Sequence, residues 1–240
     1  MNEAMTEKPR IQNPLILGLD TTQPTLCLAL TRGAEVLASV TDNSGLPHSQ
    51  RLFPMLDELL KTQALTIHEV DLLAVNTGPG SFTGLRVGIA AVKGLATTLG
   101  KPAMGVNALD ALALAAGVTG VPIVVLINAA KEELYVGLRW VEADLSVRAL
   151  GEDRVMSFEK LRLELQTQFA DSEVVLIGSG ATAHETELSS LTTRWKWVAT
   201  LDSLAPTIGI AALHQWQAGR LPAVEAYYIR LSEAESKLGK

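Results

Sequence analysis

The sequence predicts an α/β protein built from two related lobes, each with a mixed sheet flanked by helices. Three observations predict this fold class. A buried strand, a glycine-rich loop and a long helix follow one another over residues 71–99. Three short strands with tight connections precede this unit over residues 15–40 and indicate an antiparallel meander. Finally, Ile123–Leu138 repeats the apolar pattern of Leu15–Leu30 when the two segments are aligned without gaps.

Length and composition limit the number of domains and the classes of protein to which the chain can belong. The 240 residues suffice for one large domain or two of ordinary size, and a hydrophobic share of 48% supplies a sizeable core. The formal net charge is −6, so we expect isolated nucleic-acid binding to be weak, because such binding relies on cations that neutralise phosphates. Cys27 is the sole cysteine, which excludes an internal disulfide and suits a reducing compartment. The sequence shows neither a signal-peptide core nor a run of about 18 apolar residues, so we expect a cytoplasmic protein without a membrane span.

The first half of the chain is predicted to contain a three-stranded meander, a helix and then a second strand–helix unit. Strands are expected where apolar residues alternate or run between turn residues, and helices where they recur every three or four positions. Ser81 is a suitable N-cap for the glycine-rich helix, and Gly100-Lys101-Pro102 stops it. In chain order the expected elements are the strands Leu15–Asp20, Thr25–Thr31 and Glu35–Val40, the helix His48–Gln63, the strand Leu72–Val75, the helix opening at Ser81, the strand Ala103–Val106 and the helix Ala108–Ala116.

The second half is less regular. Its expected elements are the strands Pro122–Asn128 and Leu134–Trp140, a helix from Ser157 to Gln168, the strand Val174–Ile177, the helix Pro206–Ala218, and a short final strand or extended tail at Tyr227–Leu231. We place the lobe boundary at Val106–Asn107, which gives an N-terminal lobe of residues 1–106 and a C-terminal lobe of residues 107–240. In the gapless alignment of the two hairpins, Asp20 falls on Asn128.

The glycine-rich helix carries small residues at helical spacing, namely Gly84, Gly88, Ala91 and Gly94. Interior glycines each cost about 1 kcal/mol relative to alanine, so a close contact should offset them. One interpretation is close packing on the protein's own sheet. The other is contact with a helix from another chain, in which a two-fold axis would join this helix and the preceding one into a four-helix contact.

Asp20, Thr21 and Thr22 follow the first strand and open its hairpin. A carboxylate and hydroxyls at this place are able to position magnesium, water or phosphate, or they can close a local turn. The matching segment of the second half is Asn128-Ala129-Ala130, which has neither charge nor hydroxyl. A phosphate clamp built from both hairpins would therefore be incomplete.

No catalytic motif is evident elsewhere. The loop Gly78-Pro79-Gly80-Ser81 lacks the Gly-Lys-Ser/Thr ending of a phosphate-binding P-loop. The four histidines show no metal-ligand spacing, and no Gly-x-Ser-x-Gly nucleophile motif occurs. We therefore predict no catalytic residue and no metal ligand, which weighs against a peptidase.

The segments LILGLDTT, PHSQRLFPML, AVNTGPGSFTGLRVGIAAVKGLA and MGVNALDALA resemble the bacterial TsaB (YeaZ) family, over Leu15 to about Ala115. In the second half the chain departs from the family's pattern: Asn128–Tyr135 (NAAKEELY) stands where Asp-Ala-Arg-Arg-Gly-Glu-Val-Tyr is usual, and Ala226–Arg230 stands for Pro-x-Tyr-Leu-Arg. The resemblance implies the actin/Hsp70/sugar-kinase (ASKHA) type of fold, which agrees with the repeated hairpins.

The resemblance also implies a function. A family member would be a non-catalytic subunit that binds the related protein TsaD. With the ATPase TsaE it would support transfer of threonylcarbamoyl from its adenylate to N6 of the adenosine 3′ of the anticodon, in tRNAs reading codons that begin with A. No cofactor is implied for this chain, and ATP or ADP with Mg is left open for the complex. A free-standing ATP-dependent phosphotransferase of the same fold is the alternative.

The resemblance further implies a homodimer when the chain is alone, use of the same helical face for TsaD, and tRNA contact only through the complex. The residues predicted for the partner interface are Ser81, Gly84, Gly88, Ala91, Leu52 and Met55. The residues predicted for a vestigial phosphate site are Asp20, Thr21 and Thr22.

Overall fold

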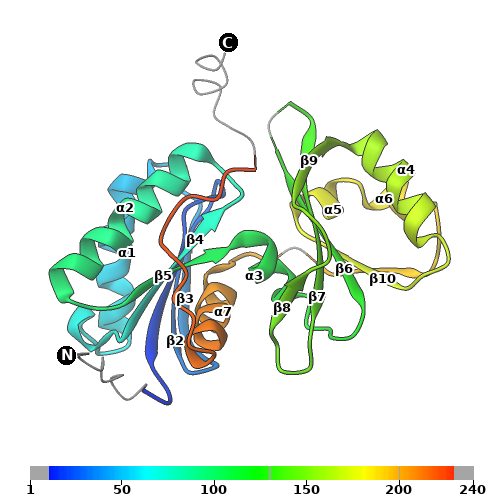
Figure 1. Cartoon of the computed structure of the whole chain (residues 1–240). Helices are drawn as coiled ribbons and strands as arrows, with labels where there is room; N and C mark the ends of the chain where they lie inside the picture. Colours follow the sequence, from blue (N-terminus) through cyan, green and yellow to red (C-terminus); the bar gives the residue numbers. More distant parts are fainter. Residues whose placement is uncertain (1–10, 130, 200, 230–240) are drawn as a thin grey trace, which may run out of the picture.

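Two mixed sheets stand beside each other with helices on their faces in the computed structural model, which describes residues 11–129, 131–199 and 201–229 (Figure 1). The first sheet has the strand order β3-β2-β1-β4-β5, and the second has the order β11-β10-β6-β7-β8, with β9 also paired to β7. This arrangement agrees with the predicted α/β class. Among the described residues, no helix combines the length and the apolar character needed to cross a membrane.

The first sheet opens with the predicted meander. β1 (Leu15–Asp20) pairs antiparallel with β2 (Leu26–Arg32), which in turn pairs antiparallel with β3 (Glu35–Asp42). On the other side of β1, β4 (Leu72–Gly78) is parallel to it, and β5 (Ala103–Asn107) forms the edge beyond β4. Because parallel neighbours require crossover connections, helices separate these last strands in the chain.

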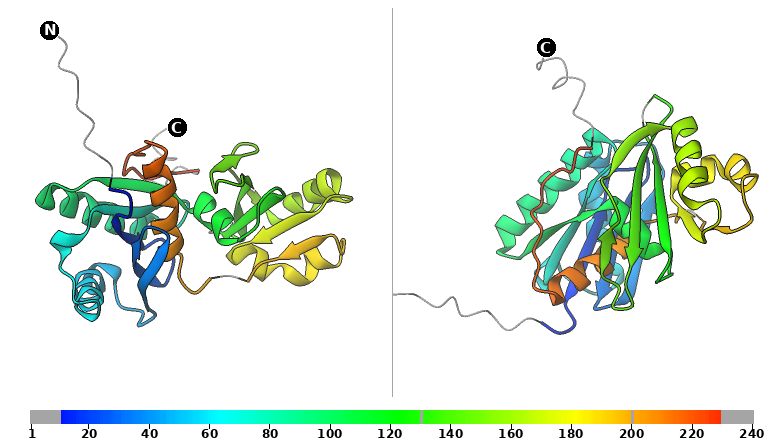
Figure 2. Two further views of the ribbon diagram at one scale, coloured as in Figure 1. Left: turned by 90° about the horizontal axis from the view of Figure 1, so that it is seen from below. Right: turned by 45° about the vertical axis from the view of Figure 1, so that its right-hand side comes forward.

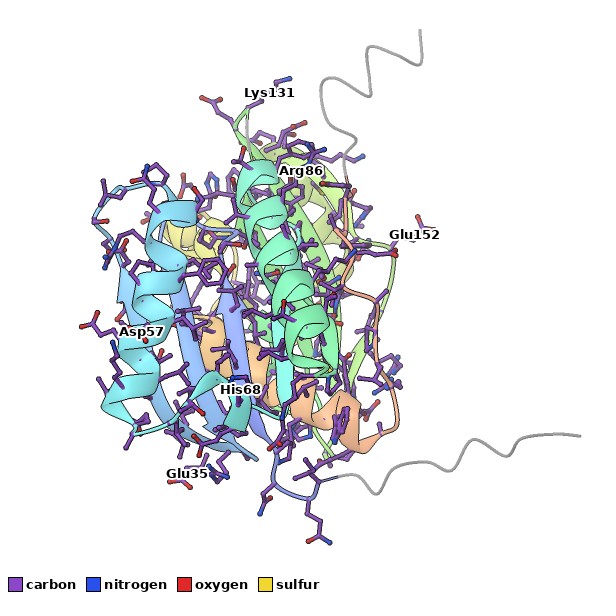
Figure 3. The ribbon with its side chains drawn as sticks, turned by 90° about the vertical axis from the view of Figure 1, so that its left-hand side faces the viewer. Glu35, Asp57, His68, Arg86, Lys131 and Glu152 are labelled. Atoms are coloured by element: carbon purple, nitrogen blue, oxygen red, sulfur yellow. The ribbon has the colours of Figure 1, made fainter. Side chains whose placement is uncertain are left out.

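α1 (His48–Thr62) and α2 (Phe82–Leu99) cover the outer face of the first sheet and lie next to each other there (Figure 3). The Ser81 hydroxyl accepts a hydrogen bond of 3.3 Å from the Gly84 N–H, which confirms the predicted N-cap of α2. α2 ends at Gly100, whose φ of 62° is left-handed. A single 3₁₀ turn, η1 (Ile67–Glu69), lies between α1 and β4.

Two helices occupy the space between the sheets (Figure 2). α3 (Ala108–Ala115) follows β5 directly and packs on the inner face of the second sheet. α7 (Ala205–Gln217) comes after the second sheet in the chain but packs back on β1 and β2 of the first. Gly18 allows this approach, since a Cβ there would overlap the Ala205 carbonyl oxygen. The division into residues 1–106 and 107–240 stays a prediction.

The second sheet is built around an antiparallel hairpin, and its outer strands are short. Its strands are β6 (Pro122–Asn128), β7 (Glu133–Val141), β8 (Val147–Ala149), β9 (Arg154–Ser157), β10 (Val174–Ile177) and β11 (Trp195–Trp197). The helices on its outer face are α4 (Phe158–Phe169), α5 (Ser179–Ala183) and α6 (Glu185–Ser189). β8, β9, β11, α5 and α6 are additions to the predicted elements.

The two hairpins occupy equivalent positions, but the gapless alignment between them is wrong by one residue in its first strand. Asp20 pairs with Cys27 across the first hairpin, whereas Asn128 pairs with Leu134 across the second. The first connection therefore has six residues, 21–26, and the second has five.

The side-chain faces show the same shift. Leu17 packs under α1 and α2 on the outer face, but Val125, which the gapless alignment places on it, packs on α3. Removing one residue from the first connection aligns Leu17 with Val124, which does face outward. Asp20 then falls on Ile127 and not on Asn128.

A C-terminal strap, defined here as residues 219–229, runs back along the first sheet. The Gly105 N–H of β5 donates to the Pro222 carbonyl oxygen at 3.1 Å, and the Tyr227 N–H donates to the Thr77 carbonyl oxygen at 2.8 Å. The strap has no strand, so the expected element at Tyr227–Leu231 is an extended segment as far as residue 229; Arg230 and Leu231 lie outside the described residues.

The strap also reaches a buried arginine of the second sheet. Arg139 of β7 is 2% exposed, and its guanidinium holds the Asp153 carboxylate through two hydrogen bonds of 2.6 and 2.8 Å. Its Nε donates to Asp110 Oδ1 of α3 at 2.6 Å. The Tyr227 hydroxyl donates to Asp153 at 3.0 Å, and burial together with this carboxylate raises the pKa of Tyr227 to about 12.

Candidate functional site

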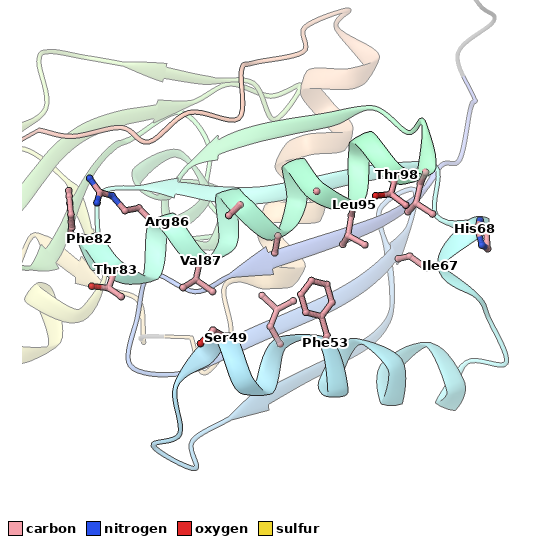
Figure 4. A pocket seen from close by; sticks show the side chains of 15 residues that line it. Ser49, Phe53, Ile67, His68, Phe82, Thr83, Arg86, Val87, Leu95 and Thr98 are labelled. Atoms are coloured by element: carbon pink, nitrogen blue, oxygen red, sulfur yellow. The ribbon is translucent and has the colours of Figure 1, made fainter.

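An apolar groove of about 1050 Å³ runs between α1 and α2 (Figure 4). Both helices contribute side chains, among them Leu52 and Phe53 from α1 and Val87 and Leu95 from α2. Phe53 is 52% exposed although it is a large hydrophobic side chain. A contiguous exposed apolar surface of this kind is typical of a protein-docking site.

The side of α2 that faces the groove is lined by small residues. Ala90, Ala91 and Gly94 lie there between Val87 and Thr98. A Cβ added at Gly94 would have no other atom within 4 Å, so this part of the helix is open. Small side chains would let a second helix approach toward the short end of the usual 8–10 Å range.

Gly84 and Gly88 do not belong to this open side, and their assignment to the partner interface was wrong. Both are buried, and a Cβ at Gly84 would overlap the carbonyl oxygen of Thr21. A Cβ at Gly88 would overlap the Thr21 hydroxyl and approach Val75 to 3.2 Å. These two glycines therefore let α2 pack tightly on the protein's own sheet, which is the first of the two interpretations of the glycine-rich helix.

Of the remaining predicted interface residues, three line the groove or a neighbouring hollow and one lies in the core. Ala91 and Leu52 line the groove, although Leu52 is only 2% exposed. Ser81 is exposed at a smaller hollow that adjoins the N-terminal end of α2. Met55 is 1% exposed within the core under α1 and does not line the groove. Whether the accessible ones contact a partner stays a prediction.

Sequence reasoning missed the groove residues Phe53, Val87 and Ala90, and it named Gly94 only as one of the small residues of the glycine-rich helix. The sequence of α1 did contain a usable signal. Phe53 lies outside the row of apolar residues that faces the core, so it is a large hydrophobic residue at an exposed position. On α2, the apolar character extends around much of the helix, so the pattern does not single out the open side.

The second predicted site lies where β1 ends. Asp20 is 1% exposed, and its Oδ1 accepts hydrogen bonds from the Thr22 N–H at 2.8 Å and from Asn76 Nδ2 at 3.1 Å. Burial raises the pKa of Asp20, and the hydrogen bonds from Thr22 and Asn76 only partly oppose that shift. Asn76 was not predicted, although parallel neighbours end at one edge of a sheet, which places the end of β4 beside the end of β1.

The hydroxyls beside Asp20 are also used within the fold. Thr21 Oγ1 donates to the Gly84 carbonyl oxygen at 2.7 Å, and Thr22 Oγ1 accepts from Asn76 at 3.0 Å. The Thr22 carbonyl oxygen accepts from the Ser81 N–H at 2.9 Å. Hydrogen bonds of the Asp20–Thr22 segment thus tie the end of β1 to the first turn of α2, which is the role of a structural turn.

Asp20 lines a pocket of about 210 Å³, and Ile127 lines the same pocket from β6. After the register correction, Ile127 is the counterpart of Asp20, so the second lobe presents an alkyl group where a phosphate clamp would need a polar one. Within the described ranges, no group of three or more His, Cys, Asp and Glu side chains is arranged to hold a metal ion.

Comparisons with known proteins show similarity to proteins of tRNA threonylcarbamoyladenosine biosynthesis. Residues 35–196 match the family model of TsaD, tRNA N6-adenosine threonylcarbamoyltransferase. The chain is 30% identical to the tRNA threonylcarbamoyladenosine biosynthesis protein TsaB of Escherichia coli K12 over 171 residues, which cover 69% of this chain and 71% of that protein. The match to TsaB of Haemophilus influenzae is 38% identical over 106 residues and spans 44% of either chain.

A solved structure matches nearly end to end. YeaZ from Pseudomonas aeruginosa superposes with a TM-score of 0.73 at 25% sequence identity, covering 90% of this chain and 99% of that one. The match confirms the predicted two-lobed α/β fold of the actin/Hsp70/sugar-kinase type.

Proposed function

Since this chain belongs to the TsaB (YeaZ) family of tRNA threonylcarbamoyladenosine biosynthesis proteins, we propose that it is a non-catalytic subunit that binds TsaD through the groove between α1 and α2. The open apolar groove is the observation that carries this proposal. It has the exposed aromatic residue and the small-residue helix side that a partner helix needs, and Phe53 would be its anchor.

The similarity to TsaD suggests how one surface can serve two partners. A groove formed by two neighbouring helices can pair with a copy of itself about a two-fold axis, which gives a four-helix contact. Because the chain matches the TsaD family model, TsaD would carry a related pair of helices and replace one copy. In this proposal the chain is a homodimer when alone and a heterodimer with TsaD in the working complex.

The other components follow from the same proposal. TsaE would join the TsaD complex, and tRNA would be contacted only through that complex, because a net charge of −6 disfavours phosphate binding by this chain alone. The chain itself would need no cofactor, and ATP or ADP with Mg would belong to the complex. The complex would transfer threonylcarbamoyl from its adenylate to N6 of the adenosine 3′ of the anticodon, in tRNAs reading codons that begin with A.

Phe53→Asp is expected to weaken both the homodimer and the TsaD complex at least about tenfold, because it places a charge in the apolar groove. Light scattering after size exclusion measures the first, and calorimetric titration with TsaD measures the second. Leu163→Asp on α4 is the matched control, since Leu163 is a similarly exposed hydrophobic residue, at 57%, on the other lobe. Complexes that survive Phe53→Asp, or that Leu163→Asp weakens equally, would rule out this groove.

The purified chain alone is expected to hydrolyse no ATP above the buffer background, with or without Mg. Asp20 Oδ1 already accepts two hydrogen bonds within the fold, and apolar Ile127 lines the same pocket. Phosphate release from labelled ATP measures this, with Asp20→Asn as the comparison and thermal melts to show that both proteins are folded. Steady turnover that Asp20→Asn abolishes would instead assign the chain as an ATP-dependent phosphotransferase.

A further inference from the structure

A second pocket, of about 230 Å³, lies away from the groove, where α3, α7, the β7–β8 turn and the strap meet. Its polar wall residues are Asp110, Ser146, His214, Gln215 and Arg220. Its apolar wall residues include Leu114, Leu145 and Val147. None of these residues lines the α1–α2 groove or the Asp20 pocket, so this cavity has no role in the function proposed above.

Two polar atoms of these walls are buried without a partner. His214 Nε2 and Gln215 Oε1 are enclosed, yet neither has a hydrogen-bond partner among the described residues. Buried polar groups are hydrogen-bonded in the great majority of cases, so each such atom calls for a partner, either a water molecule or a bound ligand. Burial also lowers the pKa of His214, which favours the neutral imidazole.

Charges of opposite sign face the same pocket. Asp110 Oδ1 accepts a hydrogen bond from Arg139 Nε, and Asp110 Oδ2 has no hydrogen bond in the described part of the chain. Arg220 is exposed and makes no ion pair with any described residue, but it is near enough to Asp110 to lower the pKa of that carboxyl. A carboxylate oxygen and a guanidinium are therefore both available on one cavity wall.

The turn over the pocket is held in an unusual conformation. Leu145 has a φ of 62°, in the left-handed region that branched, bulky residues seldom adopt. Two hydrogen bonds of 2.9 Å hold it, from the Leu145 N–H to Glu142 and from the Glu142 N–H to Ser146. The turn thereby places the Leu145 side chain on the pocket wall.

We propose that this pocket binds a small α-amino acid in its zwitterionic form. The ammonium group meets Asp110 Oδ2 and Gln215 Oε1, and the carboxylate meets Arg220 and accepts a hydrogen bond from a proton-bearing Nε2 of His214 as its second donor. An aliphatic side chain then packs against Leu145. The volume lies below the roughly 300–1,000 Å³ of sites for drug-sized ligands, so only a small ligand fits.

Calorimetric titration of the full chain with L-valine tests this proposal. We expect a dissociation constant of roughly 1 mM, since the ligand has few atoms. Isovalerate lacks the ammonium group and isobutylamine lacks the carboxylate, so each is expected to bind at least about tenfold more weakly. Absence of binding by L-valine, as in a pocket that holds water alone, overturns the proposal. Equal binding by isovalerate also overturns it, because a simple anion site would then suffice.

Paired variants locate the binding. Arg220→Gln is expected to weaken L-valine at least about tenfold, because it removes the guanidinium that holds the carboxylate. Arg148→Gln is the control, since Arg148 is an exposed arginine of β8 next to the turn and does not line the pocket. Thermal melts confirm that both variants fold. Equal weakening by both variants, or by neither, overturns the assignment to this pocket.

Discussion

Gly84→Ala is expected to lower the melting temperature by about 10 °C or to prevent folding. The new methyl group would overlap the Thr21 carbonyl oxygen, so α2 would have to move away from β1. That movement would also break the 2.7 Å hydrogen bond from the Thr21 hydroxyl to the Gly84 carbonyl oxygen. Overpacking costs about 1–3 kcal/mol or more. Each kcal/mol is worth roughly 2–4 °C in a chain of this size.

Gly94→Ala on the same helix is the matched control for that measurement by circular dichroism. Its Cβ meets open space, and alanine is the better helix former by about 1 kcal/mol. Gly94→Ala should therefore leave the melting temperature unchanged or raise it slightly. If Gly84→Ala and Gly94→Ala have the same melting temperature, the tight packing of α2 on Thr21 is refuted.

Arg139→Met is expected to destabilise the protein by about 3–5 kcal/mol at neutral pH, as measured by urea unfolding. The change keeps an unbranched apolar stem but leaves the carboxylates of Asp110 and Asp153 without their shared cation. Among the described residues, Asp153 would then keep a hydrogen bond only from the Tyr227 hydroxyl of the strap.

The pH dependence of this loss gives a second readout. Burial raises the pKa of Asp110 even with the arginine in place, so its neutral form is favoured further once the arginine is gone. Stability of Arg139→Met relative to the unmodified protein should then improve as the pH falls and the Asp110 carboxyl takes up a proton. Arg148→Met, at an exposed arginine, is the control and should cost little. A cost for Arg139→Met no larger than that of the control would contradict the role of this cluster.

Long amphipathic and alternating segments made most of the fold predictable. α1, α2 and the β1–β2–β3 meander each contain enough periods for the spacing of apolar residues to identify them. β8, β9 and β11 have only three or four residues, and α5 and α6 have five. Elements that short span at most about two periods of the apolar pattern, so tertiary contacts and not sequence pattern define them.

The candidate site was less predictable because it depends on rotation and register. Spacing shows that Gly84 and Gly88 share one side of α2, but it does not show which side meets the sheet. Likewise, the one-residue difference between the two hairpin connections decides whether Asp20 matches Asn128 or Ile127. Both questions are settled by packing between segments that are distant in the sequence.

The placement of α7 and the strap has a consequence for how the chain can fold during its synthesis. A chain emerging from the ribosome usually folds its N-terminal part first. Here the inner face of β1 and β2 is covered by α7, and the free edge of β5 is covered at Gly105 by the strap. The N-terminal sheet therefore remains unfinished until residues 205–229 have been made, and it is completed only after the sheet that follows it in the chain.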